Sequence, residues 1–302
     1  MAAFKHPPFL TAGDKIAITS TARLISKEEI KWAKQKLESW GYEVVLGATI
    51  GLKHYQYAGT DQERADALQE LINSDDINAI LCARGGYGTV RILDKLDFTS
   101  FMQKPKWIIG YSDVTILHAH INNYLGIQTL HASMPINFEN NTLESLISIK
   151  ESLEGSSLSY HFPGHPLNRK GKCTGEIIGG NLSILYSILG TSSGFNPDNK
   201  ILFIEDLDEY LYHIDRMMIA LKRAGKLSKI KGLIVGGMTK MNDNNIPFGQ
   251  SAEEIILEHC KEFDYPICFQ APFGHLEDNH SLKLGAMHSL TIIDDGAELK
   301  TI

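Results

Sequence analysis

Short hydrophobic runs alternate with amphipathic stretches through the first half of the chain. The runs, each typical of a buried strand, span residues 15–19, 42–46, 79–83 and 107–109. Between the first two runs, apolar residues recur at helical spacing from Ile30 to Trp40. Strands that alternate with helices over short connections predict a parallel sheet with helices on both faces. Such sheets bind ligands at the carboxyl ends of their strands, where candidate chemistry is expected.

Three pairs of a hydroxyl residue and a glutamate three positions later predict helix starts. These capping boxes are Ser26 with Glu29, Thr60 with Glu63, and Ser251 with Glu254. A further helix is expected over residues 89–96, after a glycine-rich turn. In the second half, the pattern predicts strands over residues 201–204 and 233–235, a helix over 212–221 and a terminal strand or hairpin over 290–299.

The pattern loosens around residues 157–172, where histidine, proline and glycine recur. Such a cluster indicates a linker or a crossover between domains. A chain of 302 residues accommodates one large or two medium domains without disulfides to hold its core. We therefore predict an N-terminal α/β domain over residues 1–155, a linker over residues 156–172 and a C-terminal domain over residues 173–302.

The composition is that of an ordinary globular protein and argues against several classes of partner. The chain is 43% hydrophobic and 22% charged, with a formal net charge of −7. An acidic balance without a long basic run argues against nucleic acid or an anionic membrane as the main partner. Neither an apolar signal core nor a segment long enough to span a bilayer is present, so a cytoplasmic location is expected.

Neither a metal nor another cofactor is predicted. None of the four cysteines forms a C-x-x-C pair, and no H-E-x-x-H motif is present. His118 and His120 lie two positions apart on a predicted helix and therefore do not share a face. Metal-dependent hydrolysis is for these reasons the least favoured function.

Ser112 stands where a strand gives way to a helix. Residues 107–109 form the strand, Gly110 permits a sharp turn, and Asp113 begins the helix. A serine there is pushed out of the backbone beside a helix N-terminus, as a hydrolytic nucleophile requires. The nucleophile-elbow pattern has glycine where Val114 stands, and an ordinary serine N-cap explains the same residues.

A glycine-rich loop, Arg84-Gly85-Gly86-Tyr87-Gly88, follows the third predicted strand. It matches neither the P-loop nor G-x-G-x-x-G, although its amides could still bind a phosphate. It is also explained as a tight turn. In a third interpretation the N–H of Gly86 forms part of an oxyanion hole, because the loop is expected on the same rim of the sheet as Ser112.

Two residues of the second half could complete a catalytic triad with Ser112. Glu205 directly follows the predicted strand 201–204, and His275 follows Pro272-Phe273-Gly274. Serine needs an imidazole to take its proton, and the imidazole needs a carboxylate to fix its tautomer. The order serine, acid, histidine occurs in known triads. Taken singly, Glu205 is also explained as part of an acidic loop and His275 as a turn histidine.

Seven motifs occur together in one order along the chain. They are Gly13-Asp14-Lys15-Ile16-Ala17, the glycine-rich loop, Gly110-Tyr111-Ser112-Asp113-Val114-Thr115, Gly180-Asn181-Leu182-Ser183, Phe203-Ile204-Glu205-Asp206, Ile214-Asp215-Arg216 and Phe273-Gly274-His275. In these motifs, over nearly its whole length, the chain resembles the LD-carboxypeptidase family, serine peptidases of the S66 type. The resemblance implies a Rossmann-like N-terminal α/β domain with a parallel sheet, a smaller β-rich C-terminal domain, and an active site between them without a metal.

The resemblance also implies a role for each catalytic candidate. Ser112 is then the nucleophile, His275 the general base and Glu205 the acid. The N–H groups of Gly86 and Asp113 are then the oxyanion donors. The family's usual reaction removes the terminal D-alanine from a muropeptide tetrapeptide during cell-wall recycling in the bacterial cytoplasm. Members of the family often form dimers, so a homodimer is expected.

Three further residues are candidates for substrate binding. A carboxypeptidase must recognise a free carboxylate, which Arg84 could bind, although Arg84 could equally pair with a structural acid. Tyr87 belongs to the same glycine-rich loop. Asn181 is a candidate on its motif alone.

Two other functions stay open. The immunity branch of the same family cleaves aminoacyl-nucleotide antibiotics, and it would need an aromatic platform for the base. The three tryptophans, Trp32, Trp40 and Trp107, fall on a predicted helix and a predicted strand, which favours the cell-wall role. A non-catalytic peptide- or sugar-binding protein would use the same interdomain cleft, and the three triad candidates argue against it.

Overall fold

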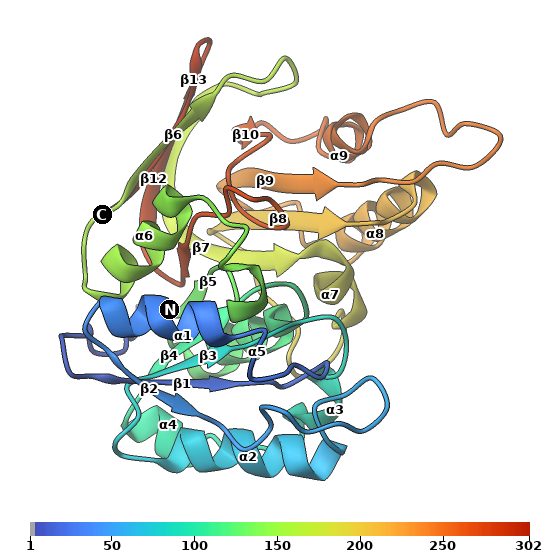
Figure 1. Cartoon of the computed structure of the whole chain (residues 1–302). Coiled ribbons are helices and arrows are strands. Elements are labelled where there is room, and N and C mark those ends of the chain that lie inside the picture. Colours follow the sequence, from blue (N-terminus) through green and yellow to red (C-terminus); the bar gives the residue numbers. More distant parts are fainter. Residues whose placement is uncertain (1–3) are drawn as a thin grey trace.

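Two β-sheets with helices packed against them make up the computed structural model, which describes residues 4–302 (Figure 1). The first sheet has six strands in the order β11-β5-β4-β3-β1-β2. They are β1 (Lys15–Thr19), β2 (Glu43–Leu46), β3 (Ala79–Cys82), β4 (Trp107–Gly110), β5 (Thr129–His131) and β11 (Leu282–Leu284). Neighbouring strands pair in parallel except β11, which runs antiparallel to β5.

Helices cover both faces of the first sheet, as the alternating pattern predicts. They are α1 (Lys31–Ser39), α2 (Asp61–Asn73), α3 (Val90–Leu93), α4 (Thr99–Gln103), α5 (Thr115–His120) and α6 (Leu143–Leu153). Ile16 and Ile18 of β1 belong to the cluster around Leu37 of α1. Ala17, which points the other way, belongs to the cluster around Leu68 of α2. Because the strand is buried on both faces, its sequence is a continuous apolar run.

The second sheet has seven strands in the order β10-β9-β8-β7-β12-β13-β6. They are β6 (Ser159–Pro163), β7 (Gly171–Asn181), β8 (Ile201–Leu207), β9 (Gly232–Thr239), β10 (Ile267–Cys268), β12 (Met287–Ile293) and β13 (Gly296–Thr301). Strands β7 to β10 pair in parallel, whereas β12, β13 and β6 pair antiparallel. The helices of this half are α7 (Leu182–Ser187), α8 (Leu211–Arg223) and α9 (Ala252–His259).

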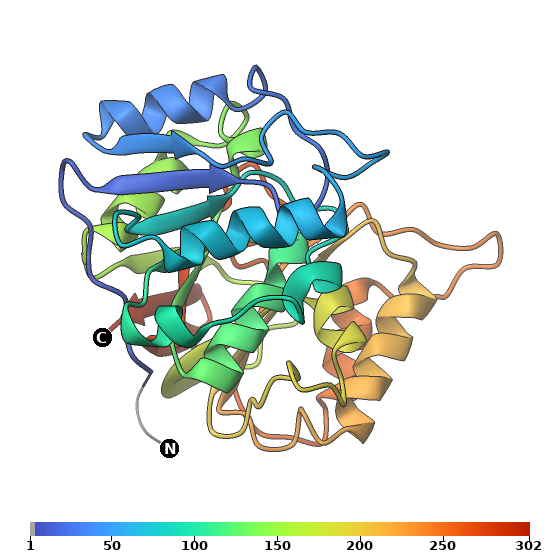
Figure 2. The same cartoon turned by 90° about the horizontal axis from the view of Figure 1, so that it is seen from below.

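A shared hydrophobic core joins the two sheets. It contains Ile108 of β4, Leu117 of α5 and Met217 of α8. In the view from below, α8, drawn in orange, lies to the side of the cyan α2 that covers the first sheet (Figure 2). Gly180, at the end of β7, packs so closely on α5 that a Cβ atom there would lie 2.6 Å from Thr115 Oγ1. This contact brings the carboxyl edge of the second sheet to the helix that follows Ser112.

The fold class is confirmed, with a parallel-sheet N-terminal part and a second, sheet-rich part. The capping boxes that begin at Thr60 and Ser251 are confirmed as well. Ser26 and Glu29 exchange the expected hydrogen bonds, but a turn over residues 27–30 intervenes and α1 begins only at Lys31.

Two sequence predictions, over residues 156–172 and 89–96, need correction. The predicted linker over residues 156–172 contains β6, which pairs with β13 at the edge of the second sheet. The helix predicted over residues 89–96 has only four residues, Val90–Leu93. The division into residues 1–155 and 173–302 stays a prediction, and β11, from the C-terminal part, extends the first sheet. Among residues 4–302, no helix combines the length and the apolar character that crossing a membrane requires.

Candidate active site

Ser112 occupies a sharp turn between β4 and α5. Its φ of 62° is in the left-handed region, which residues other than glycine rarely adopt, and a short 3-10 helix begins at the same residue. Gly110 makes the turn possible, because a Cβ atom there would lie 2.9 Å from Val114 Cγ2. The turn is therefore as tight as a nucleophile elbow, with the strained backbone at the serine itself.

The glycine-rich loop lies directly against this turn. A Cβ atom on Gly85 would be 3.3 Å from Ser112 Oγ. Gly86 has a φ of 105°, and a Cβ atom on it would be 2.6 Å from Arg23 Cδ. The loop thus depends on glycine both for its backbone conformation and for its close packing.

A buried hydrogen bond fastens the loop to the turn. Asp113 Oδ2 accepts a hydrogen bond of 2.9 Å from the backbone N–H of Thr89, the residue after the loop. Burial raises the pKa of the Asp113 carboxyl above its ordinary value, although the hydrogen bonds from Thr89 act in the opposite direction. Thr89 Oγ1 in turn lies 2.8 Å from Thr21 Oγ1. The interaction ties the ends of β1, β3 and β4 together.

Glu205 and His275 form the other half of the site. Glu205 lies near the end of β8, is fully buried, and its Oε2 is 2.6 Å from His275 Nδ1. His275 belongs to the loop after β10. The preceding position, 274, has room for glycine only. A Cβ atom on Gly274, whose φ is 109°, would be 2.7 Å from Glu205 Oε2. The carboxylate can therefore fix the tautomer and orientation of the imidazole.

The protein environment favours the protonated form of His275. Burial alone lowers the pKa of the imidazole, but the charge and the hydrogen bond of Glu205, with a further contribution from Asp206, raise it above the ordinary value. The His275 ring packs on Tyr111, the neighbour of Ser112, with ring centroids 4.7 Å apart. Within residues 4–302, Ser112 Oγ and His275 share no hydrogen bond. Catalytic hydrogen bonds often tighten only when substrate is bound.

Asn181 has a structural position at the rim of the site. Its backbone N–H donates to Thr115 Oγ1 at 3.0 Å, and its Oδ1 accepts from the N–H of Ile184 at the start of α7. Its Nδ2 donates to Asp206 Oδ1 at 2.8 Å, so one amide N–H is left for a substrate. Burial and the neighbouring charge of Glu205 raise the pKa of Asp206 to about 6.

The two candidates from the glycine-rich loop differ in their surroundings. Arg84 Nη1 donates to the carbonyl of Leu24 at 3.3 Å and lies 3.9 Å from Glu29 Oε1, so it contacts a structural acid. Tyr87 is 45% exposed and available for contact with a ligand.

Sequence reasoning missed Arg23 and Thr89. Arg23 is exposed, and its aliphatic stem covers Gly86. Arg23 follows the carboxyl end of β1, and β1 pairs with β3, which precedes the glycine-rich loop. Because the carboxyl ends of parallel strands meet at one edge of a sheet, Arg23 could have been predicted to lie near this loop. Within the described part of the chain, no group of three or more His, Cys, Asp or Glu side chains is arranged to hold a metal ion.

Comparison with known proteins gives the same family at both ends of the chain. The models of the LD-carboxypeptidase N-terminal domain and C-terminal domain match residues 16–132 and 174–290. The probable murein peptide carboxypeptidase of Bacillus subtilis is 32% identical over 299 residues, covering 97% of this chain and 94% of that protein. The microcin C7 self-immunity protein MccF of Escherichia coli is 30% identical over 264 residues, covering 75% and 76% of the two chains.

The fold is shared with solved structures of related enzymes. The crystal structure of muramoyltetrapeptide carboxypeptidase from Oxalobacter formigenes superposes with a TM-score of 0.86 at 25% identity, covering 95% of this chain and 98% of that one. The sequence matches and this superposition extend over both sheets and over the segments that carry Ser112, Glu205 and His275. The chain therefore belongs to the LD-carboxypeptidase family, the S66 peptidases, and is a serine-type hydrolase.

Proposed function

We propose that this enzyme hydrolyses the L,D-peptide bond before the terminal D-alanine of muropeptide tetrapeptides. The observation that carries the proposal is the 2.6 Å hydrogen bond between Glu205 and His275, next to the strained turn at the half-buried Ser112. A carboxylate, an imidazole and an exposed hydroxyl are the three groups that serine hydrolysis requires. The substrate class is supported by relatives named murein peptide carboxypeptidase and muramoyltetrapeptide carboxypeptidase.

The proposed reaction passes through an acyl-enzyme. With Nδ1 held by Glu205, His275 uses Nε2 to take the proton of Ser112 while Oγ attacks the scissile carbonyl carbon. The imidazolium then protonates the leaving amine, and free D-alanine departs. A water molecule, deprotonated by the same imidazole, attacks the ester and regenerates the Ser112 hydroxyl.

The negative charge that develops on the carbonyl oxygen needs fixed donors. We assign this role to the N–H groups of Gly86 and Asp113, because the glycine-rich loop packs against Ser112 and is fastened there through Thr89. A side chain on Gly86 would collide with Arg23, so the approach to this loop stays open only for glycine.

Recognition of the free carboxylate of D-alanine requires a cation near the oxyanion donors. Arg64 contacts the glycine-rich loop, through the carbonyl of Gly88, but it is fully buried. Arg84 and Arg23 lie at the same loop, and either could form a charge-assisted hydrogen bond with the carboxylate. Arg84 shares its charge with Glu29, whereas the stem of Arg23 lies on Gly86 itself. Tyr87 and the remaining amide N–H of Asn181 are proposed to contact the peptide.

The second candidate is cleavage of aminoacyl-nucleotide antibiotics, favoured by the 30% identity with the microcin C7 self-immunity protein. That activity needs an aromatic surface for the base. Trp107 is fully buried in β4, while Trp32 on α1 and Trp40 at the end of α1 both pack against Lys36. The exposed ring of Tyr87, on the glycine-rich loop, is the candidate for such a surface. The muropeptide is therefore the preferred substrate.

Direct comparison of two substrates tests the proposal. The purified enzyme is incubated with an L,D-linked muropeptide tetrapeptide and, separately, with an aminoacyl-sulfamoyl adenosine, and the products are separated by chromatography. We expect free D-alanine from the first substrate and a higher kcat/KM for it. Cleavage of the nucleotide alone would replace the cell-wall role with the immunity role. Cleavage of neither would refute both.

We also propose that the enzyme acts in the cytoplasm on recycled cell-wall fragments and forms a homodimer. Fractionation of the producing cells tests the location. Light scattering after size-exclusion chromatography tests the dimer, because a mass near 33.6 kDa would show a monomer.

A further inference from the structure

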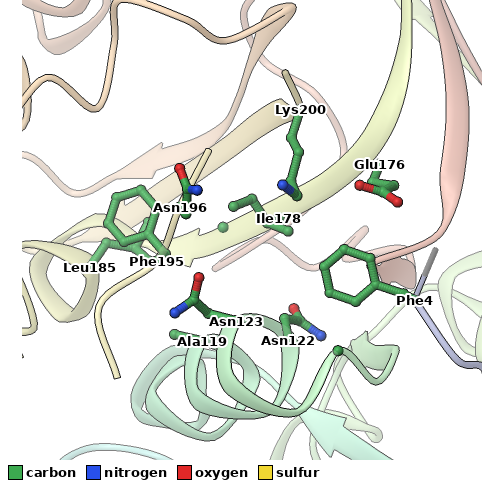
Figure 3. Close-up of a pocket in the computed structure, with 12 residues that line it drawn as sticks. Phe4, Ala119, Asn122, Asn123, Glu176, Ile178, Leu185, Phe195, Asn196 and Lys200 are labelled. Carbon is green, nitrogen blue, oxygen red and sulfur yellow. The ribbon is translucent and has the colours of Figure 1, made fainter. Parts of the chain in front are cut away.

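A cavity of about 120 Å³ lies between the second sheet and the helix that follows Ser112 (Figure 3). One wall is Ile178 of β7 together with Lys200, directly before β8. The facing wall is the end of α5 and the π-helical turn over Ile121–Leu125. Lys200 and Glu205 are five residues apart along β8, or roughly 16 Å at about 3.3 Å per residue. The cavity is thus separate from the catalytic groups.

Two buried polar side chains point into this cavity without a full set of partners. Lys200 is only 6% exposed, and within residues 4–302 the single acceptor for its ammonium group is the carbonyl of Asp198, at a long 3.4 Å. Asn122 is 4% exposed, and its Nδ2 donates to the carbonyl of Ile127. Its Oδ1 is directed into the cavity, and no donor within residues 4–302 reaches it (Figure 3). Both groups thus keep hydrogen-bonding capacity that is free for a ligand in the cavity.

The remaining polar groups divide the cavity into a donor side and an acceptor side. Asn196 Oδ1 accepts from the N–H of Asp198, which leaves Nδ2 as the free end beside Lys200. On the helix wall, the side chain of Asn123 lies next to that of Asn122 (Figure 3). Glu176 adds a carboxylate at the other end of the cavity, and no ion pair with Lys200 forms in the described chain. Cationic and anionic groups therefore face the same small space.

The apolar walls limit the size of a ligand. Phe195 and Leu185 close one end of the cavity, and the ring of Phe4 lies at the opposite end (Figure 3). A ligand that fits must carry opposite charges a few ångströms apart and a small or medium apolar group.

We propose that this cavity binds a free amino acid in its zwitterionic form. The carboxylate contacts Lys200 Nζ and Asn196 Nδ2. The ammonium group contacts the Asn122 Oδ1 and the Glu176 carboxylate, and the apolar side chain lies against Phe195. Binding of an amino acid in this cavity does not depend on the reaction proposed for Ser112.

Calorimetric titration of the full-length enzyme tests this site. The probes are L-leucine and D-alanine, each compared with its N-acetyl derivative and its amide. We expect at least one free amino acid to bind, and each blocked derivative to bind about tenfold more weakly or worse, because each lacks one of the two charges. Absence of binding by both amino acids at about 10 mM would overturn the proposal. Equal binding of the blocked derivatives would overturn it too.

A pair of lysine variants locates the bound amino acid. Lys200→Met removes the buried cation and should weaken binding about tenfold or more. Lys229→Met removes an exposed lysine whose ammonium is 3.4 Å from Asp198, outside the cavity, and should leave binding unchanged. Glu176→Gln, at a half-buried position, removes the proposed partner of the ammonium group and should also weaken binding, so it tests the site if Lys200→Met unfolds. Wild-type affinity in folded Lys200→Met, or in Glu176→Gln, would show that the amino acid binds elsewhere.

Discussion

The side chain of Asp113 holds the backbone of Thr89, with 2.9 Å between Oδ2 and the amide nitrogen. Through this contact Asp113, the residue after the proposed nucleophile, fixes the glycine-rich loop that carries the second proposed oxyanion donor. Both residues are buried, so neither water nor another side chain replaces the hydrogen bond easily. In the proposed mechanism, alignment of the oxyanion hole therefore depends on the side chain of Asp113 as well as on its backbone N–H.

Replacing this carboxylate should impair catalysis more than binding. Asp113→Ala leaves the proposed donor N–H in place but releases the loop, so we expect kcat to fall by about 10²-fold with little change in KM. The free energy of unfolding should fall by about 1–3 kcal/mol, because the Thr89 N–H loses its acceptor. Asp113→Asn keeps an acceptor oxygen and should restore much of kcat. Wild-type kcat in Asp113→Ala would rule out this positioning role.

The pH dependence of kcat/KM should report the environment of His275. The proposed general base is the neutral imidazole, so activity should be lost as pH falls through its pKa. Burial lowers that pKa, but the charge and hydrogen bond of Glu205 raise it above the ordinary 6.5, so the acid limb should lie above pH 6.5. An acid limb at or below that value in the wild-type enzyme would contradict the proposed pairing.

The pH profile of Glu205→Gln tests the cause of the raised His275 pKa. Without the carboxylate charge, burial of His275 dominates, so the acid limb should move to lower pH. The maximal rate should fall on the order of 10⁴-fold, the size of the loss known for an acid-to-amide change in a serine protease triad. Circular dichroism and the thermal midpoint serve as controls for folding.

Replacing Gly274 should destabilise the protein and impair catalysis through a steric clash. A substitution at a second glycine separates this clash from backbone strain. Gly274→Ala places a methyl group 2.7 Å from Glu205 Oε2 and also strains a backbone whose φ is 109°. Gly249 has a φ of 90° and nothing within 4 Å of a new Cβ atom, so Gly249→Ala measures the backbone strain alone. We expect a loss of about 1 kcal/mol for Gly249→Ala and more for Gly274→Ala, together with reduced kcat only in Gly274→Ala. Urea denaturation and steady-state kinetics give both quantities, and equal effects would contradict the clash.

Arg84 and Arg23, both at the glycine-rich loop, should contribute unequally to substrate binding. Arg84 contacts Glu29 and the carbonyl of Leu24, so Arg84→Met should change KM little. Arg23→Met should raise KM for the tetrapeptide about tenfold, the loss expected for a charge-assisted hydrogen bond of about 1.5 kcal/mol. A larger increase in KM from Arg84→Met than from Arg23→Met would show that Arg84 binds the substrate carboxylate.

Strands β1, β3 and β4 of the first sheet were predictable because they are buried on both faces. Strands β5 and β11 of the same sheet, each three residues long, were not predicted. Ile16, Ala17 and Ile18 point alternately to two hydrophobic clusters, which makes the strand visible as an unbroken apolar run. The turn at Ser112 was also visible, since Gly110 before it permits the sharp change of direction. The family motifs then brought Glu205 and His275 into consideration, and the structure places them within hydrogen-bond distance.

Strand β6 escaped prediction because it lies at an edge. Tyr160 and Phe162 are buried while the residues between and beside them are exposed, which is the pattern of a half-buried strand. Pro163 and the nearby histidines and glycines gave the stronger signal of a linker. The contact between Asp113 and Thr89 escaped for another reason: local spacing carries no information on which strand ends meet.

Release of D-alanine by Ser112→Ala tests the central claim most directly. The wild-type enzyme and the variant are given the same L,D-linked tetrapeptide, and free D-alanine is measured over time. Without the hydroxyl no acyl-enzyme can form, so we expect the rate to fall by at least about 10³-fold while the thermal midpoint is retained. D-Alanine released by the folded variant at the wild-type rate would contradict the assignment of Ser112 as the nucleophile.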